Sequence, residues 1–138
     1  MRLNSEQIKE VINQPIISIV ATIRQDGSVH MTPVWHLELE GFVYIVIEDS
    51  SVKSKNLKND ERISLCIATE TKPQKWVQIN GKAQLTKDNI VEIVNLMAIH
   101  YLGQAEGDRY SKKVLKELDF IAVKIIADKV IGFDMAES

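Results

Sequence analysis

The chain has 138 residues, 45% of them apolar and 26% charged, which is the composition of an ordinary globular protein. Seventeen Lys and Arg against nineteen Asp and Glu give a net charge of -2, which argues against a nucleic-acid-binding protein. No apolar stretch approaches the ~20 residues that span a bilayer, the N-terminus lacks a hydrophobic signal core, and the single cysteine excludes an internal disulfide. We expect one cytoplasmic domain over residues 1–138, with no membrane and no nucleic-acid partner.

A helix is predicted first. Apolar side chains recur at helical spacing within residues 4–14. Asn4 and Gln7 have the three-residue separation of a capping box. Pro15 disfavours helical geometry at the residue before it, so the helix is expected to end there.

Three antiparallel strands with short connections are predicted next, at residues 16–24, 29–39 and 42–48. An Asp-Gly turn at 25–28 joins the first two. Pro33 lies inside the second strand, where a missing N–H requires an edge, a bulge or a break. The short connections predict that the three strands pair in chain order as a meander.

The rest of the chain mixes helices and strands without regular alternation. Residues 50–59 predict a loop leading into a short helix, and 103–108 a loop before a helix that Ser111 caps. Gly81 is expected to mark a bulge. The other strands are predicted at 62–69, 76–85, 120–126 and 130–133, and the other helices at 88–102 and 111–118. This order predicts a mainly β (α+β) fold, an antiparallel barrel with flanking short helices.

The histidines and the cysteine give no argument for catalysis or metal binding. His30 and His36 are expected to be two strand-surface histidines. His100 ends a helix, where a histidine favours the negative end of the helix dipole. Cys66 lies in an apolar run and is expected to be a buried small side chain.

A polar segment after the third strand is a candidate phosphate site. Ser50 and Ser51 offer hydroxyls, and Lys53 and Lys55 offer positive charge, at the start of a helix whose first N–H groups are free. A helix beginning near Ser51 places Lys53 and Asn56 on one face, with Lys55 pointing elsewhere. On spacing alone, a solvated basic face is the alternative.

The second unusual segment combines a proline and a tryptophan in mid-strand, Pro33 and Trp35. Such a pair indicates a backbone that leaves its ladder to meet a flat ligand. An irregular edge strand with Trp35 in the core is the alternative.

Together these segments resemble the pyridoxamine-phosphate-oxidase-like flavin-binding split β-barrels. Residues 19–35 are similar to that superfamily's first hairpin, A-T-x-x-x-D-G-x-P-x-x-x-P-V-W. Three further matches follow in the same order: 53–57 to K-x-x-N-L, 77–83 to V-x-V-x-G-x-A, and 130–133 to the usual C-terminal ending. The resemblance covers nearly the whole chain and implies an FMN-binding split barrel.

The resemblance also implies a homodimer with FMN at the subunit interface. The phosphate would meet Lys53 and the start of its helix, and residues 31–35 would present backbone groups to the isoalloxazine ring. Trp76 and Gln78 would close the site from the partner subunit. The candidate cofactor-binding residues are Met31, Thr32, Pro33, Val34, Trp35, Ser50, Ser51, Lys53, Lys55, Asn56, Trp76 and Gln78.

The implied function is a flavin (FMN)-dependent oxidoreductase acting on a small-molecule substrate. The Arg-rich C-terminal segment of true pyridoxamine-phosphate oxidases has no counterpart in the sequence, so we expect the namesake reaction to be absent. Short relatives often use a deazaflavin coenzyme and others bind haem. A deazaflavin-dependent reductase and a non-enzymatic flavin-storage protein are therefore the alternatives.

Overall fold

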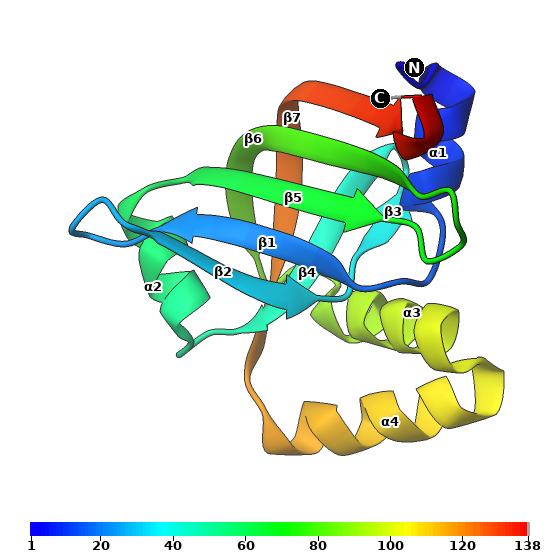
Figure 1. The fold of residues 1–138 in the computed structure, drawn as a ribbon. Coiled ribbons are helices and arrows are strands. Elements are labelled where there is room, and N and C mark those ends of the chain that lie inside the picture. Colours follow the sequence, from blue (N-terminus) through cyan, green and yellow to red (C-terminus); the bar gives the residue numbers. More distant parts are fainter. Residues whose placement is uncertain (138) are drawn as a thin grey trace.

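An antiparallel sheet wrapped around one core forms the body of the protein in a computed structural model (Figure 1). The structure describes residues 1–137, so Ser138 of the predicted domain lies outside the described residues. None of the described helices is long and apolar enough to cross a membrane. The elements in chain order are α1 (Ser5–Ile12), β1 (Ser18–Ile23), β2 (Val29–Val34), β3 (Leu37–Leu39), β4 (Phe42–Glu48), α2 (Val52–Asn59), β5 (Arg62–Ala68), β6 (Lys75–Thr86), α3 (Ile90–Leu102), α4 (Gln104–Glu117), β7 (Phe120–Asp134) and a final 3₁₀ turn, η1 (Met135–Glu137).

The strand order is β2-β1-β5-β6-β7-β4-β3, and every neighbouring pair is antiparallel. Inward side chains from both halves of the sheet meet in one core, among them Val20 and Leu65 from one half and Ile45 and Val123 from the other. The sheet therefore curls into a barrel, while its edge strands β2 and β3 do not pair with each other. The predicted antiparallel split barrel is confirmed.

The predicted meander is wrong, because the expected strand at 29–39 is two strands at opposite edges of the sheet. β2 pairs with β1, and β3 pairs with β4. Pro33 lies on the edge strand β2, as its missing N–H requires. The break falls just after it, at Trp35 and His36, where the chain crosses from one edge of the sheet to the other.

The two strands predicted at 120–126 and 130–133 are one strand, β7, which runs along both halves of the barrel. The predicted bulge is confirmed, because the register with β6 shifts between Asn80 and Gly81. A Cβ at Gly81 would collide with the backbone carbonyl of Ile126. Glycine is therefore required where the two strands cross most closely, and β7 bends there without ending.

Helix α1 forms with the predicted capping box, in which Asn4 and Gln7 each bond the other's backbone N–H at 2.9 Å. The loop predicted at 103–108, with Ser111 as a helix cap, is wrong. Helix α4 begins directly after Gly103, whose φ of 87° turns the chain back along α3. Ser111 is buried in mid-helix and donates a hydrogen bond to the side chain of Asn95 at 2.7 Å.

Cys66 is exposed, so its predicted burial is wrong. On β5, Ile63, Leu65 and Ile67 point into the core, and strand alternation then directs Cys66 to the outer face. Partial desolvation raises the pKa of its thiol.

We predict that Gly107→Ala destabilises the protein by about 1–3 kcal/mol, through overpacking between α4 and α3. A Cβ at Gly107 would lie 2.5 Å from both Cα and N of Ile99. Helix propensity alone would favour alanine by about 1 kcal/mol. Whether the free energy of unfolding falls or rises therefore tests the close packing. Urea unfolding measures it.

Lys113→Ala is the matched control, because Lys113 is an exposed residue of the same helix. Its effect should stay within about 0.5 kcal/mol. A Gly107→Ala protein as stable as the wild type, or more stable, would contradict the predicted overpacking.

Candidate functional site

A cavity of about 400 Å³ lies at the open side of the barrel. Its walls come from the end of β2, the end of β4, the start of α2, and the facing surfaces of α3 and α4. Most of the lining is apolar, and the polar groups gather toward α2. The residues that matter most below are Pro33, Val34, Trp35, Ser51, Lys53 and Tyr110.

Lys53 is the positive charge at the polar end of the cavity. Its Nζ donates to the hydroxyl of Thr32 at 3.1 Å, and it forms no ion pair with a carboxylate of residues 1–136. Ser51 caps α2 by accepting from the N–H of Ser54 at 3.2 Å, which leaves its own hydroxyl proton for another partner. These donors match the needs of a phosphate group.

His30 lies beside Lys53, although it does not itself line the cavity. Contrary to the expected surface position, it is half-buried on the inward face of β2, and its Nδ1 is buried with no hydrogen-bond partner in residues 1–136. Burial, and then the positive charges of Arg24 and Lys53, lower the pKa of His30. An orphaned buried nitrogen beside an unpaired lysine fits the binding of an anion.

The other predicted phosphate ligands do not reach the cavity. Asn56 is buried, and its amide donates to the hydroxyl of Thr22 at 3.0 Å, so it stabilises the core. Ser50 and Lys55 are exposed, and neither lines the cavity. Lys53 and Asn56 are one helical turn apart on α2, as predicted. Their side chains nevertheless diverge, since Lys53 points toward the cavity and Asn56 toward β1.

The segment Met31–Trp35 contributes in part. Pro33, Val34 and Trp35 line the cavity, and Thr32 takes part through its bond to Lys53. Met31 is 66% exposed and lies on the opposite, outer side of the sheet.

Trp35 is stacked in an aromatic cluster with two tyrosines of the helices. Its ring lies 4.6 Å from that of Tyr101, with 10° between the planes, and 5.6 Å from that of Tyr110 at 50°. Trp35 and Tyr110 line the cavity. The sequence gave no signal that the rings of Tyr101 and Tyr110 would meet Trp35.

A buried hydrogen-bond network lies directly behind Trp35, and it corrects the predicted surface position of His36. His36 is fully buried. Its Nε2 lies 2.8 Å from the carbonyl of Ile12, so the ring proton resides there, and its Nδ1 accepts from Ser18 Oγ at 2.9 Å. The Tyr101 hydroxyl donates to the carbonyl of Ile16 at 2.9 Å and accepts from the backbone N–H of His36 at 2.9 Å. The network holds the strand break against α1, β1 and α3.

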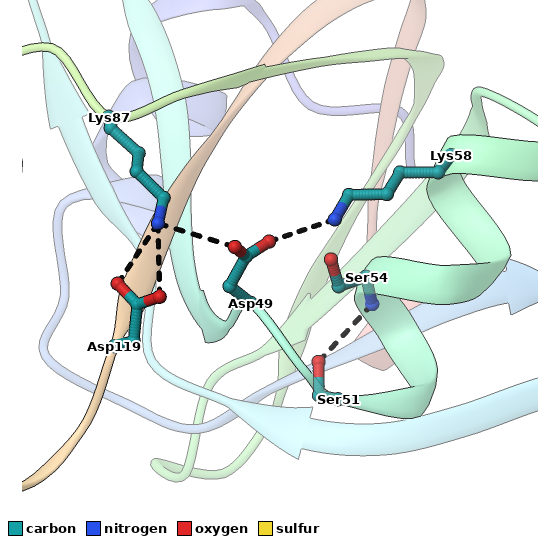
Figure 2. A network of polar contacts seen from close by, with 6 residues as sticks. All are labelled: Asp49, Ser51, Ser54, Lys58, Lys87 and Asp119. Carbon is teal, nitrogen blue, oxygen red and sulfur yellow. Dashed lines mark hydrogen bonds and ion pairs between the residues drawn. The ribbon is translucent and has the colours of Figure 1, made fainter.

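Surface charges tie the start of α2 to neighbouring segments. Figure 2 shows Asp49 between Lys58 and Lys87, at 2.9 and 3.3 Å, and Lys87 reaching on to Asp119 at 3.0 Å. Hydrogen bonds from Lys58 and Lys87 lower the pKa of Asp49. These exposed pairs contribute little stability each, but together they join α2, β4 and the segments beside β6 and β7 next to Ser51.

Trp76 and Gln78 lie far from the cavity of their own chain. They belong to the outer face of β2, β1, β5, β6 and β7, where Trp76 contacts Phe133 at 5.3 Å between ring centroids and Gln78 donates to Asn80 at 3.0 Å. We call this surface the outer sheet face. Its apolar members include Ile19, Val29, Met31, Cys66, Ala68, Trp76 and Phe133.

Comparisons with known proteins agree with the fold. The sequence profile of the family described as Pyridoxamine 5'-phosphate oxidase matches residues 5–127. A conserved hypothetical protein of Mycobacterium tuberculosis has a TM-score of 0.79 at 22% identity, with 96% of this chain and 86% of that chain covered. A search of curated proteins returns no match.

Two further solved structures that resemble this chain have names that mention a cofactor. An F420 reductase has a TM-score of 0.72 at 13% identity, with 88% of this chain and 94% of that chain covered. An FAD-binding protein of Mesorhizobium loti has a TM-score of 0.69 at 15% identity, with 96% and 95% covered. At such low identities these likenesses establish the fold alone.

We predict that the free energy of unfolding falls as the pH drops below 6.5, the ordinary histidine pKa. Burial lowers the pKa of His36 in the folded protein, against the opposing effect of its bond to Ile12. The unfolded chain therefore takes up the proton first, and stability that is full above pH 6.5 is lost as the pH falls toward the folded pKa. The loss is at most about 1.4 kcal/mol per pH unit.

Urea unfolding at pH 7.5 and 5.5 measures this loss. His36→Gln should lower the stability at pH 7.5 and reduce the difference between the two pH values, and the lowered pKa of His30 accounts for part of what remains. Lys113→Ala, an exposed residue of α4, should keep the wild-type difference. An unchanged pH difference in His36→Gln would show that another group is responsible.

Proposed function

We propose, since the chain belongs to the pyridoxamine 5'-phosphate oxidase family, that it is an FMN-dependent oxidoreductase that acts on a small-molecule substrate. The observation that carries the proposal is the cavity beside β2, which joins a polar end, where Lys53 lies with Ser51 and Glu48, to an apolar end with aromatic walls. A flavin mononucleotide has the same two parts, a phosphate and a flat ring system.

The residues present fit the phosphate part. A phosphate carries close to two negative charges and cannot be desolvated without partners. Lys53 forms no ion pair with the carboxylates of residues 1–136, so two of its three protons are open to a ligand. The hydroxyl of Ser51 and the first N–H groups of α2 lie on the same side.

The apolar part of the cavity fits the ring system. Pro33 and Val34 bring the backbone of an edge strand to the cavity, and edge strands carry unpaired N–H and C=O groups. Trp35 and Tyr110 offer aromatic surface. Bound flavin would supply the hydride chemistry, and the protein would supply position and electrostatics.

We further propose that the protein is a homodimer that forms through the outer sheet face. Exposed apolar patches of this kind on soluble proteins mark interaction sites. Ile19 is 40% and Met31 66% exposed, and both lie on this face, to which Trp76 also belongs. A dimer burying on the order of 1,600 Å² would cover the face and bring Trp76 and Gln78 toward the partner's cofactor.

A deazaflavin-dependent reductase is the second candidate, favoured by the structural likeness to the F420 reductase. Both coenzymes present a flat ring system and a phosphate, so the same residues would hold either one. The absorption spectrum of the purified protein separates them. Turnover with NADPH or a reduced deazaflavin and a simple acceptor then separates an enzyme from a flavin-storage protein.

We predict that Lys53→Ala weakens FMN binding roughly 10- to 150-fold, the effect of losing one hydrogen bond to a charged group. The fold should remain intact, because the Lys53 side chain lies at the rim of the core. Fluorescence titration of FMN measures the change. Lys55→Ala is the matched control on the exposed side of the same helix, and it should bind almost as the wild type does. If Lys53→Ala and wild type bind FMN with equal affinity, the phosphate binds elsewhere, and Arg24 is the next residue to test.

We predict that Ile19→Lys gives a monomer with weakened flavin binding, because a charge would be buried in the proposed interface. Light scattering at micromolar concentration measures the mass, against 15.6 kDa for one chain. Val91→Lys is the control, since Val91 is 63% exposed on α3, away from the outer sheet face. A wild-type protein that scatters as a monomer would refute the dimer.

A further inference from the structure

We infer that His30 is a second cation at the phosphate end of the cavity, one that becomes charged when the phosphate binds, so that flavin affinity depends on pH. This inference rests on the proposed binding of a flavin phosphate. It names a residue that the sequence pattern did not assign to the site, and it adds a pH dependence that the lysine anchor alone would not give.

The position of His30 supports the assignment. On β2 it pairs with Thr22 of β1 and lies two residues before Thr32, whose hydroxyl accepts from Lys53. Because side chains alternate along a strand, His30 and Thr32 point to the same inward face. The two side chains and Lys53 thus form one polar cluster, in which Lys53 lines the cavity and His30 and Thr32 lie behind it.

The buried nitrogen supplies the second observation. His30 Nδ1 is shielded from solvent and has no hydrogen-bond partner within residues 1–136. Buried polar atoms are almost always paired, and an unpaired one calls for a partner that comes from outside the chain. A phosphate oxygen would accept a hydrogen bond from a protonated ring.

The charges that act on His30 decide its protonation. Arg24 faces it from the β1–β2 turn, where the guanidinium donates to the carbonyl of Val29 at 3.0 Å, and Lys53 faces it from α2. Thr22 on the neighbouring strand is neutral. Burial, with these two positive charges, lowers the pKa of His30 in the protein alone, so the ring is neutral at pH 7.

A bound phosphate reverses this balance. Its negative charge offsets those of Arg24 and Lys53 and favours the charged imidazole. Binding is therefore accompanied by proton uptake, and the affinity rises as the pH falls through the pKa of the bound state. Because the second pKa of a phosphate is near 6, the ligand itself stays mostly dianionic above pH 6.5.

The test measures the dissociation constants of FMN and of riboflavin, which lacks the phosphate, at pH 6.5 and 8.5. Wild type should bind FMN about three- to tenfold more tightly at pH 6.5, and riboflavin equally at both. His30→Gln should bind FMN as the wild type does at pH 8.5 but lose the gain at pH 6.5. His100→Gln, away from this cluster, should keep it.

Calorimetry in buffers of different ionisation enthalpy gives an independent measure. Wild type should take up a fraction of a proton on binding FMN at pH 7, and His30→Gln should take up less. If FMN binds and Lys53→Ala weakens it, but His30→Gln keeps both the pH dependence and the proton uptake, the role of His30 is wrong while the proposed function stands. If no flavin binds at either pH, both are wrong.

Discussion

The break between β2 and β3, held by the buried His36, is the constraint on which the rest of the structure depends. The chain leaves one edge of the sheet and joins the other within two residues, Trp35 and His36. Hydrogen bonds join His36 and Tyr101 to each other and to Ile12, Ile16 and Ser18, which offsets the cost of burying polar groups there.

The open side of the barrel follows from that break, and so does the cavity. Trp35 faces outward from the break because His36 faces inward, and Tyr101 ties the end of α3 to the same point. The close packing of α4 on α3 at Gly107 then brings Tyr110 over Trp35. Helices that are far from β2 in the sequence thus become walls of one site.

Positive charge gathers beside the polar end of the cavity, where Lys53 lies with Ser51 and Glu48. Lys53 and Arg24 both act on His30, and Lys53 forms no ion pair with a carboxylate of residues 1–136. Such an arrangement destabilises the protein alone, since the two cations disfavour a charged His30 and its buried nitrogen is left unpaired. A bound anion would relieve both effects. The outer sheet face likewise leaves apolar side chains exposed, and a partner would cover them.

Local signals in the sequence determined the elements that depend on neighbours along the chain. The capping box at Asn4, the Asp-Gly turn, the bulge at Gly81 and the direction of Lys53 away from Lys55 all follow from backbone geometry over a few residues. The exposure of Cys66 could also have been predicted, because Ile63, Leu65 and Ile67 alternate with it along the strand. It was missed because most residues of this segment are apolar, so the alternation is not visible as a polar pattern.

Only the tertiary structure decided which strands pair and which polar groups are buried. A short connection favours a hairpin, yet β2 and β3 separate at Trp35 and His36, where the His36 side chain is buried in a hydrogen-bond network with Ile12 and Ser18. Gly103 and Gly107 are of a residue type common in loops, yet Gly107 lies inside α4. A glycine is needed there because α4 packs so closely on α3 that no larger side chain fits. Asn56 and Lys53 share a helical spacing, and their different surroundings, a threonine of the core and a cavity, separate their roles. Pairing and burial depend on residues distant in the sequence, which is why local patterns could not determine them.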